Sequence, residues 1–182
     1  MTLRRSGPRV IEKYSELPAC WVPYDTRFPL VAGQVASLVR DRIPHVTVEH
    51  IGSTAVPGCG GKGVIDVMVV CAPEVLERVK DLLAELGFQP QPTRDAFPES
   101  RPMRVGALRY QGQLFRIHAH VLTSGVPEAA RLLAFRDRLR ADAALRASYE
   151  ACKQAILAAG TSDSVSYAEA KGRFFEGVGA NR

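Results

Sequence analysis

The chain has 182 residues, of which 46% are hydrophobic and 24% are charged, and its formal net charge is +5. This length suits one domain with a full core. No apolar run approaches the roughly 20 residues that a membrane helix needs. The basic residues near the N-terminus are not followed by the apolar segment of a secretory signal. We therefore expect a cytoplasmic protein with no membrane partner.

The charge balance indicates the class of ligand. Basic residues number 24 against 19 acidic ones, and the sequence pI is about 9.2. The basic residues are dispersed, which favours local contacts with phosphate groups over a groove that tracks nucleic acid. The four cysteines contain no C-x-x-C pair and are predicted to be reduced, mostly buried thiols: Cys20, Cys59, Cys71 and Cys152.

The first half of the chain predicts an arm followed by alternating helices and strands. Residues 1–20 have little periodicity and are expected to form an N-terminal arm outside the core, while residues 21–182 form a single domain. A helix begins near Pro29 and ends before Pro44. Strands are predicted at 46–51 and 64–70, on either side of a glycine-rich loop. A second helix begins at Pro73 and ends at Gly87.

The second half predicts a hairpin and then helices. No regular element fits the proline-rich passage 90–102, which is long enough to be functional. Strands at 104–110 and 114–122 are joined by a Gln-Gly-Gln turn. Helices follow at about 127–140, 143–159 and 166–178. The sequence therefore predicts an α+β fold with a mixed β-sheet flanked by helices and a helical C-terminal third.

Asp66 stands out because it lies within an apolar strand. Burial of an unpaired carboxylate costs several kcal/mol, so the sequence predicts a cation or a metal beside it. The turn at Gly52-Ser53 frees backbone N–H groups that would hold the phosphates accompanying such a metal. Two plainer interpretations stay open. Asp66 could face solvent at a strand end, and the turn could simply require glycine.

The run EHIGSTAVPG at 49–58, followed by KGVIDVMVV at 62–70, resembles the GrpB-like family of the nucleotidyltransferase superfamily. The likeness covers roughly residues 20–178 and extends to Tyr24–Pro29, His118-Ala-His120, Phe135–Arg140 and Tyr167…Lys171…Phe174. It implies a nucleotidyltransferase-like sheet, a nucleoside triphosphate substrate and a divalent metal such as Mg²⁺ or Mn²⁺.

The resemblance gives Asp66 a catalytic and metal-binding role. His118 and His120 are two residues apart on a strand and so share a face. In the superfamily an acid on a neighbouring strand often completes the metal site, and these imidazoles could replace it, which would favour Mn²⁺ or Zn²⁺. Alternatively, both histidines are polar side chains on the wetter face of an antiparallel sheet.

Further candidates surround the predicted phosphates. The phosphate-binding set is Gly52, Ser53, Thr54, Lys62, Arg136 and Lys171. Tyr167 lies four residues before Lys171 and would form a side of the cleft. Glu49 and His50 point to opposite faces of their strand, and we place His50 near the turn. The plain alternative for these residues is a solvated or sheet-spacing role.

Two hypotheses of different classes follow. The leading one is metal-dependent transfer of a nucleotidyl group from a nucleoside triphosphate to an unidentified acceptor. Its competitor is a nucleotide- or metal-binding accessory or regulatory domain without turnover. Met68 motivates the second, because it stands where the broad superfamily carries a second acid. A third hypothesis, RNA binding, is weaker because aromatic ladders for base stacking are absent.

Overall fold

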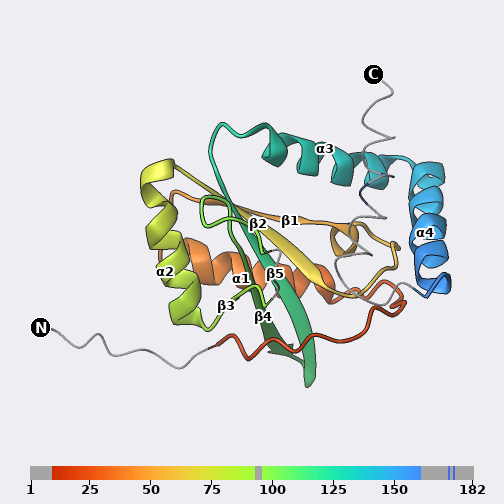
Figure 1. Ribbon diagram of the computed structural model, residues 1–182, viewed down its shortest axis with the longest axis horizontal. Helices are drawn as coiled ribbons and strands as arrows, with labels where there is room; N and C mark the ends of the chain where they lie inside the picture. The colour runs from red at the N-terminus through yellow and green to blue at the C-terminus, as the bar shows by residue number, and fades with distance from the viewer. Residues whose placement is uncertain (1–9, 93–95, 161–171, 173, 175–182) are drawn as a thin grey trace, which may run out of the picture.

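The structure is a computed structural model that describes residues 10–92 and 96–160, together with Gly172 and Phe174. A five-stranded sheet of order β1-β2-β5-β4-β3 runs through it (Figure 1). Strands β2 and β5 are parallel, and the other neighbouring pairs are antiparallel. The predicted mixed sheet is confirmed. The strands are β1 Thr47–Ile51, β2 Ile65–Cys71, β3 Gln89–Pro90, β4 Met103–Tyr110 and β5 Gln113–Thr123.

Helices cover both faces of this sheet, as predicted. The α-helices are α1 Phe28–Arg40, α2 Leu76–Leu86, α3 Pro127–Ala141 and α4 Ala143–Ala158, and short 3₁₀ turns are η1 Ser53–Ala55 and η2 Pro73–Val75. In Figure 1, α3 runs on the opposite side of β1 and β2 from α1. The predicted helix at 166–178 lies largely outside the described residues. Within the described part of the chain, no helix has the length and apolar character needed to cross a membrane.

The alternation of side chains in β2 and β5 separates the core from the other face. Ile65, Val67 and Val69 pack with Ile117 and other odd-numbered residues of β5 against the apolar sides of α1 and α2. The intervening residues of both strands necessarily point the opposite way. That second face is only partly covered, by a small cluster in which Met68 and Leu122 meet the apolar side of α3. Polar residues can therefore remain accessible there.

The N-terminal segment is held on the sheet from Ile11 onward. Ile11 is buried in the main core, and its N–H donates to Leu86 O. Glu12 forms a β-bridge with Ala107 on β4. A Cβ at Gly106 would overlap Ile11 Cγ2, so the absence of a side chain at Gly106 makes room for Ile11. The expectation that residues 1–20 lie outside the core is therefore wrong at Ile11, while the domain division at residue 20 stays a prediction.

We predict opposite effects from adding one methyl group at two glycines. Gly33→Ala on the exposed side of α1 meets nothing within 4 Å and should stabilise the protein by about 0.5–1 kcal/mol, because glycine is a poor helix former. Gly106→Ala should destabilise it by about 1–3 kcal/mol through overpacking against Ile11. Urea denaturation of both variants measures the difference. A Gly106→Ala variant as stable as the wild type would contradict the described packing of Ile11.

Candidate metal and phosphate site

Asp66, His118 and His120 meet on the partly covered face of the sheet. The parallel register places Asp66 of β2 directly beside His118 of β5. Asp66 Oδ1 lies 3.5 Å from His118 Nδ1 and 3.4 Å from His120 Nε2. One ligand atom from each of the three residues falls within 4.8 Å of the others. A carboxylate within an apolar strand needs polar partners, and the two histidines supply them.

The electrostatics of the cluster favour an ionised carboxylate. Burial raises the pKa of Asp66, but the contacts with His118 and His120 outweigh burial and hold that pKa well below its ordinary value. The side chain of Asp66 keeps 26% of its surface exposed, so the carboxylate remains reachable from outside. One carboxylate oxygen and two imidazole nitrogens form a donor set that suits Zn²⁺ or Mn²⁺. The residues fit a single divalent metal.

The turn after β1 rests directly on this carboxylate. Gly52 has φ +72°, which favours glycine, and a Cβ there would lie 2.6 Å from Asp66 Oδ2. Only a residue without a side chain allows the backbone this close to the acid. Ser53 follows at the start of η1, and its Oγ lies 2.8 Å from the position of a Cβ on Gly61. Gly52 is thus brought to the cluster, and the phosphate-binding role predicted for Gly52 and Ser53 stays a prediction.

Thr54 and His50 support the turn from the other face of β1. Thr54 is buried, and its hydroxyl donates to Val64 O at 3.3 Å and lies 3.0 Å from His50 Nε2. Burial lowers the pKa of His50 to about 4, so the ring is neutral. His50 lies near the turn, as expected. The Thr54 hydroxyl is occupied within the fold, which differs from the phosphate contact predicted for it.

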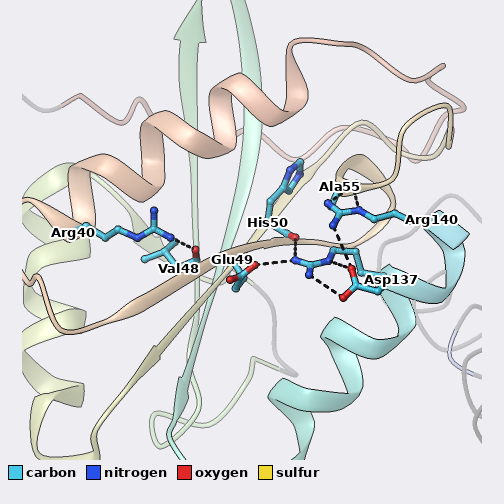
Figure 2. Close-up of polar contacts among 8 residues, drawn as sticks. Arg40, Val48, Glu49, His50, Ala55, Asp137 and Arg140 are labelled. Carbon is cyan, nitrogen blue, oxygen red and sulfur yellow. Dashed lines mark hydrogen bonds and ion pairs between the residues drawn. The ribbon is translucent and has the colours of Figure 1, made fainter.

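Arginines close the free edge of β1. Arg136 on α3 donates to Glu49 Oε2 at 2.9 Å and to His50 O at 3.0 Å, and it also pairs with Asp137. Figure 2 shows the Glu49 carboxylate on the α3 side of β1 and the His50 ring on the α1 side. The Arg136 donors are engaged at the strand edge, where sheets need protection. Its predicted triphosphate contact is thus replaced by a structural one, although Glu49 does share the face of Asp66.

Two further arginines complete this edge. Arg40 of α1 donates to Val48 O at 2.5 Å. The Val48 and His50 carbonyls on this edge of β1 therefore each accept from an arginine. Arg140 donates to Ala55 O at 2.8 Å and thereby fixes the end of η1 (Figure 2). The cations of α3 therefore hold β1 and the following turn in place.

The glycine-rich loop is held by α4. Lys153 is only 1% exposed, and its ammonium donates to Gly60 O and lies 3.4 Å from Cys59 Sγ. Glu150 Oε1 accepts from Gly60 N–H at 2.7 Å. This buried lysine was missed from the sequence because it lies in an ordinary-looking helix. Cys59 and Cys71 are buried free thiols, in agreement with prediction, whereas Cys20 is exposed.

Arg116 is the cation that the structure adds to the face of the cluster. It lies two residues before His118 on β5, and it donates to Lys62 O at 2.9 Å. The period-two pattern Arg-x-His-x-His could have identified it from the sequence. Lys62 itself lies in the loop beside Arg116 and stays a predicted phosphate ligand. Tyr167 and Lys171 lie outside the described residues, so their predicted roles stay predictions.

Two aromatic side chains flank the histidine pair. Tyr14 Oη lies 3.0 Å from His118 Nε2. Phe97 meets His120 edge to face, with 5.9 Å between ring centroids, and the Arg101 guanidinium lies 4.7 Å from the Phe97 centroid. Both come from segments without regular periodicity, the N-terminal arm and the proline-rich passage. Sequence patterns offered no signal for either.

The mixed sheet with an acid on β2 and a Gly-Ser turn after β1 is a nucleotidyltransferase-like fold. This class is supported by a structure described as that of a cytoplasmic RNA terminal U-transferase, which matches with a TM-score of 0.51 at 14% identity over 72% of this chain and 41% of that one. A family profile described as GrpB protein matches residues 19–180. The chain belongs to this GrpB family, and the predicted membership is confirmed.

Relatives in the family bear names that state no activity. The UPF0157 protein SCO7215 of Streptomyces coelicolor is 36% identical over 69% of this chain and 63% of its own length, so the match leaves over a third of that protein unaligned. The UPF0157 protein BH1888 of Halalkalibacterium halodurans is 32% identical over 81% of this chain and 74% of its own length. The crystal structure of GrpB from Enterococcus faecalis matches 87% of this chain and 99% of that one, with a TM-score of 0.64 and 22% identity.

The neutral His50 predicts a specific pH dependence of stability. Its folded pKa of about 4 lies below the ordinary histidine pKa of 6.5, so in this pH range the unfolded chain binds a proton that the folded ring does not. As pH falls from about 6.5 to about 4, the wild type should lose on the order of 3 kcal/mol through this residue, and little more below that window. Urea denaturation across this range measures the loss.

His50→Gln should lack this part of the pH dependence, although it also disturbs the contact with Thr54. His45→Gln is the matched control, because His45 is exposed. The control should follow the wild-type curve at every pH. A His50→Gln curve parallel to that of the wild type between pH 6.5 and 4 would show that the ring is not held neutral.

Proposed function

We propose that this protein binds a divalent metal through Asp66, His118 and His120 and holds the phosphates of a nucleoside triphosphate beside it. The observation that carries this proposal is the meeting of the three ligand atoms within 4.8 Å, directly beneath the turn at Gly52. A carboxylate held ionised by imidazoles has the charge and the geometry of a first-row metal site. The positively charged Arg116 on the same face supports an anionic ligand.

The chemistry that we propose for this site is transfer of a nucleotidyl group to an unidentified acceptor. A bound divalent metal would supply Lewis-acid stabilisation of charge on the reacting phosphate. The chain's own residues would position that phosphate: the Gly52-Ser53 backbone approaches it closely because no Cβ intervenes, and Arg116 and Lys62 neutralise the leaving pyrophosphate. The similar fold of the RNA terminal U-transferase supports this chemistry and makes UTP the first triphosphate to test.

Met68 favours a second candidate, which is binding without turnover. Met68 is fully buried and packs with Ile51 and Leu122 beneath α3. The position where the superfamily would place another metal-binding acid is therefore part of an apolar cluster. Fewer carboxylates at the site mean weaker support for two metals. On this candidate the protein is an accessory or regulatory domain that senses a metal or a nucleotide. We expect a cytoplasmic location for either candidate.

Titration calorimetry tests the premise shared by both candidates. The wild type is titrated with ATP, GTP, CTP and UTP, each in the presence of Mn²⁺, Mg²⁺ or Zn²⁺. Binding of at least one triphosphate at millimolar concentration or below is expected, with dependence on the metal. No binding of any triphosphate under these conditions would exclude nucleotide binding. Pyrophosphate release above background in a screen of acceptors then separates transfer from binding without turnover.

Asp66→Asn should abolish metal binding while the fold persists. The amide keeps the size of the carboxylate but removes the charge that a metal ligand supplies, so affinity for Mn²⁺ or Zn²⁺ should fall by about 100-fold or more, by comparison with losses from second-sphere changes. Equilibrium dialysis measures the affinity, and circular dichroism checks the fold.

Glu49→Gln is the matched control, because Glu49 shares the face of Asp66 but binds Arg136. This control should keep metal affinity within about twofold of the wild type, as expected for a residue that contacts neither metal nor ligand. Equal metal affinity of Asp66→Asn and wild type would remove Asp66 from the site.

A further inference from the structure

We infer that Tyr14 is a positioning residue of the metal site, which holds His118 with Nδ1 directed to the metal. The inference rests on the proposed function, because it concerns the same three ligands. Tyr14 comes from the N-terminal arm, 104 residues away from His118 in the sequence. It contacts no metal ligand atom itself and acts through the histidine.

The two nitrogens of His118 face two different partners. Nε2 lies 3.0 Å from Tyr14 Oη, and Nδ1 lies 3.5 Å from Asp66 Oδ1. A neutral imidazole carries one proton, and the nitrogen without it is the metal ligand. When no metal is bound, the ionised Asp66 accepts from Nδ1–H, and the Tyr14 hydroxyl then donates to Nε2. With a metal on Nδ1, Nε2 would carry the proton and donate to Tyr14 Oη. Tyr14 can hydrogen-bond Nε2 in both cases and so holds the ring orientation in which Nδ1 faces the metal site.

The position of Tyr14 is determined by contacts on both sides of the arm. Ile11 enters the core through the space that Gly106 leaves, and its N–H bonds to Leu86 O at 3.0 Å. Glu12 pairs with Ala107 in both directions, at 2.7 and 3.0 Å. The segment is thus registered on β4, the strand that lies next to β5 and its histidines. Tyr14 follows this bridge by two residues and so lies beside His118 of β5.

His120 provides a comparison within the same site. Its aromatic neighbour is Phe97, whose ring packs edge to face against the imidazole and has no hydroxyl. Its Nε2 is the atom that faces Asp66. Among the residues that the structure describes, an aromatic hydroxyl therefore bonds to His118 and not to His120. The loss of the Tyr14 hydroxyl should therefore change one ligand of the three.

Tyr14→Phe tests this inference with two readouts on the full-length protein. The first is affinity for Zn²⁺ and Mn²⁺ by equilibrium dialysis, which should fall about tenfold, the lower end of the effect of removing a partner from a metal-bound histidine. The second is the ¹⁵N shift of His118 Nε2 in metal-free protein at neutral pH, which reports whether this nitrogen accepts a hydrogen bond. The wild type should show a hydrogen-bonded Nε2 beside Nδ1–H, and in the variant the Nε2 shift should move to that of a nitrogen without a hydrogen bond.

Tyr110→Phe is the matched control, because Tyr110 lies at the end of β4 and packs against the core cluster. It should leave metal affinity and the ¹⁵N shift of His118 Nε2 unchanged. Ile11→Ala is a second variant that keeps the Tyr14 hydroxyl but loosens the arm. Ile11→Ala should lower metal affinity by less than Tyr14→Phe does. If Tyr14→Phe does not fold, Ile11→Ala takes its place in the affinity measurement.

The outcomes separate this inference from the proposed function. If wild type binds no metal, the proposed site fails, and the Nε2 shift still decides whether Tyr14 holds the His118 ring. If wild type binds metal and both Tyr14→Phe and Ile11→Ala match it with an unchanged Nε2 shift, the site stands and the inference about Tyr14 is overturned. Reduced affinity together with a shifted Nε2 resonance in Tyr14→Phe supports it.

Discussion

The contact between the Asp66 carboxylate and the two imidazoles of β5 is the interaction on which this site depends. It exists because β2 and β5 are parallel neighbours in a register that pairs Asp66 with His118. Antiparallel hairpins at either side of that pair supply β1 and β4, whose own contacts hold the flanking turn and the N-terminal arm. A shift of one residue in the β2–β5 register would send the acid or the histidines into the apolar core. The core packing on one face thus fixes the chemistry on the other.

The same reasoning explains why charged residues near the site divide into two kinds. Arg40 and Arg136 pair with backbone carbonyls of β1, the outermost strand, whose unpaired edge would otherwise be open to another chain. Arg116 projects from a central strand beside the histidines and meets a loop carbonyl. An arginine on a helix over a strand edge stabilises the fold, whereas an arginine on the same strand face as His118 and His120 lies beside the candidate metal site.

The sequence predicted those parts of the molecule that follow from local periodicity. The alternating apolar run around Asp66, the Arg-x-His-x-His pattern and the glycine turn each determine which way a side chain points, so the strands and most of the cluster could be predicted. The roles of Thr54 and Arg136 could not, because the His50 ring and the Glu49 carboxylate that engage them are set by tertiary packing. Tyr14 was hidden for the same reason: its partner is 104 residues distant, and Ile11 is anchored by space at Gly106 that no pattern reveals.

Met68 shows how far a shared fold can be taken as evidence for function. The superfamily that the sequence resembles implies a second acid on this strand, yet here the next position on that face, Met68, packs in the cluster beneath α3. The donor set proposed for a metal then offers one carboxylate oxygen and two imidazole nitrogens, a combination that favours borderline cations over Mg²⁺. Function in this family must accordingly be argued from the histidines and from what holds them, rather than from the sheet alone.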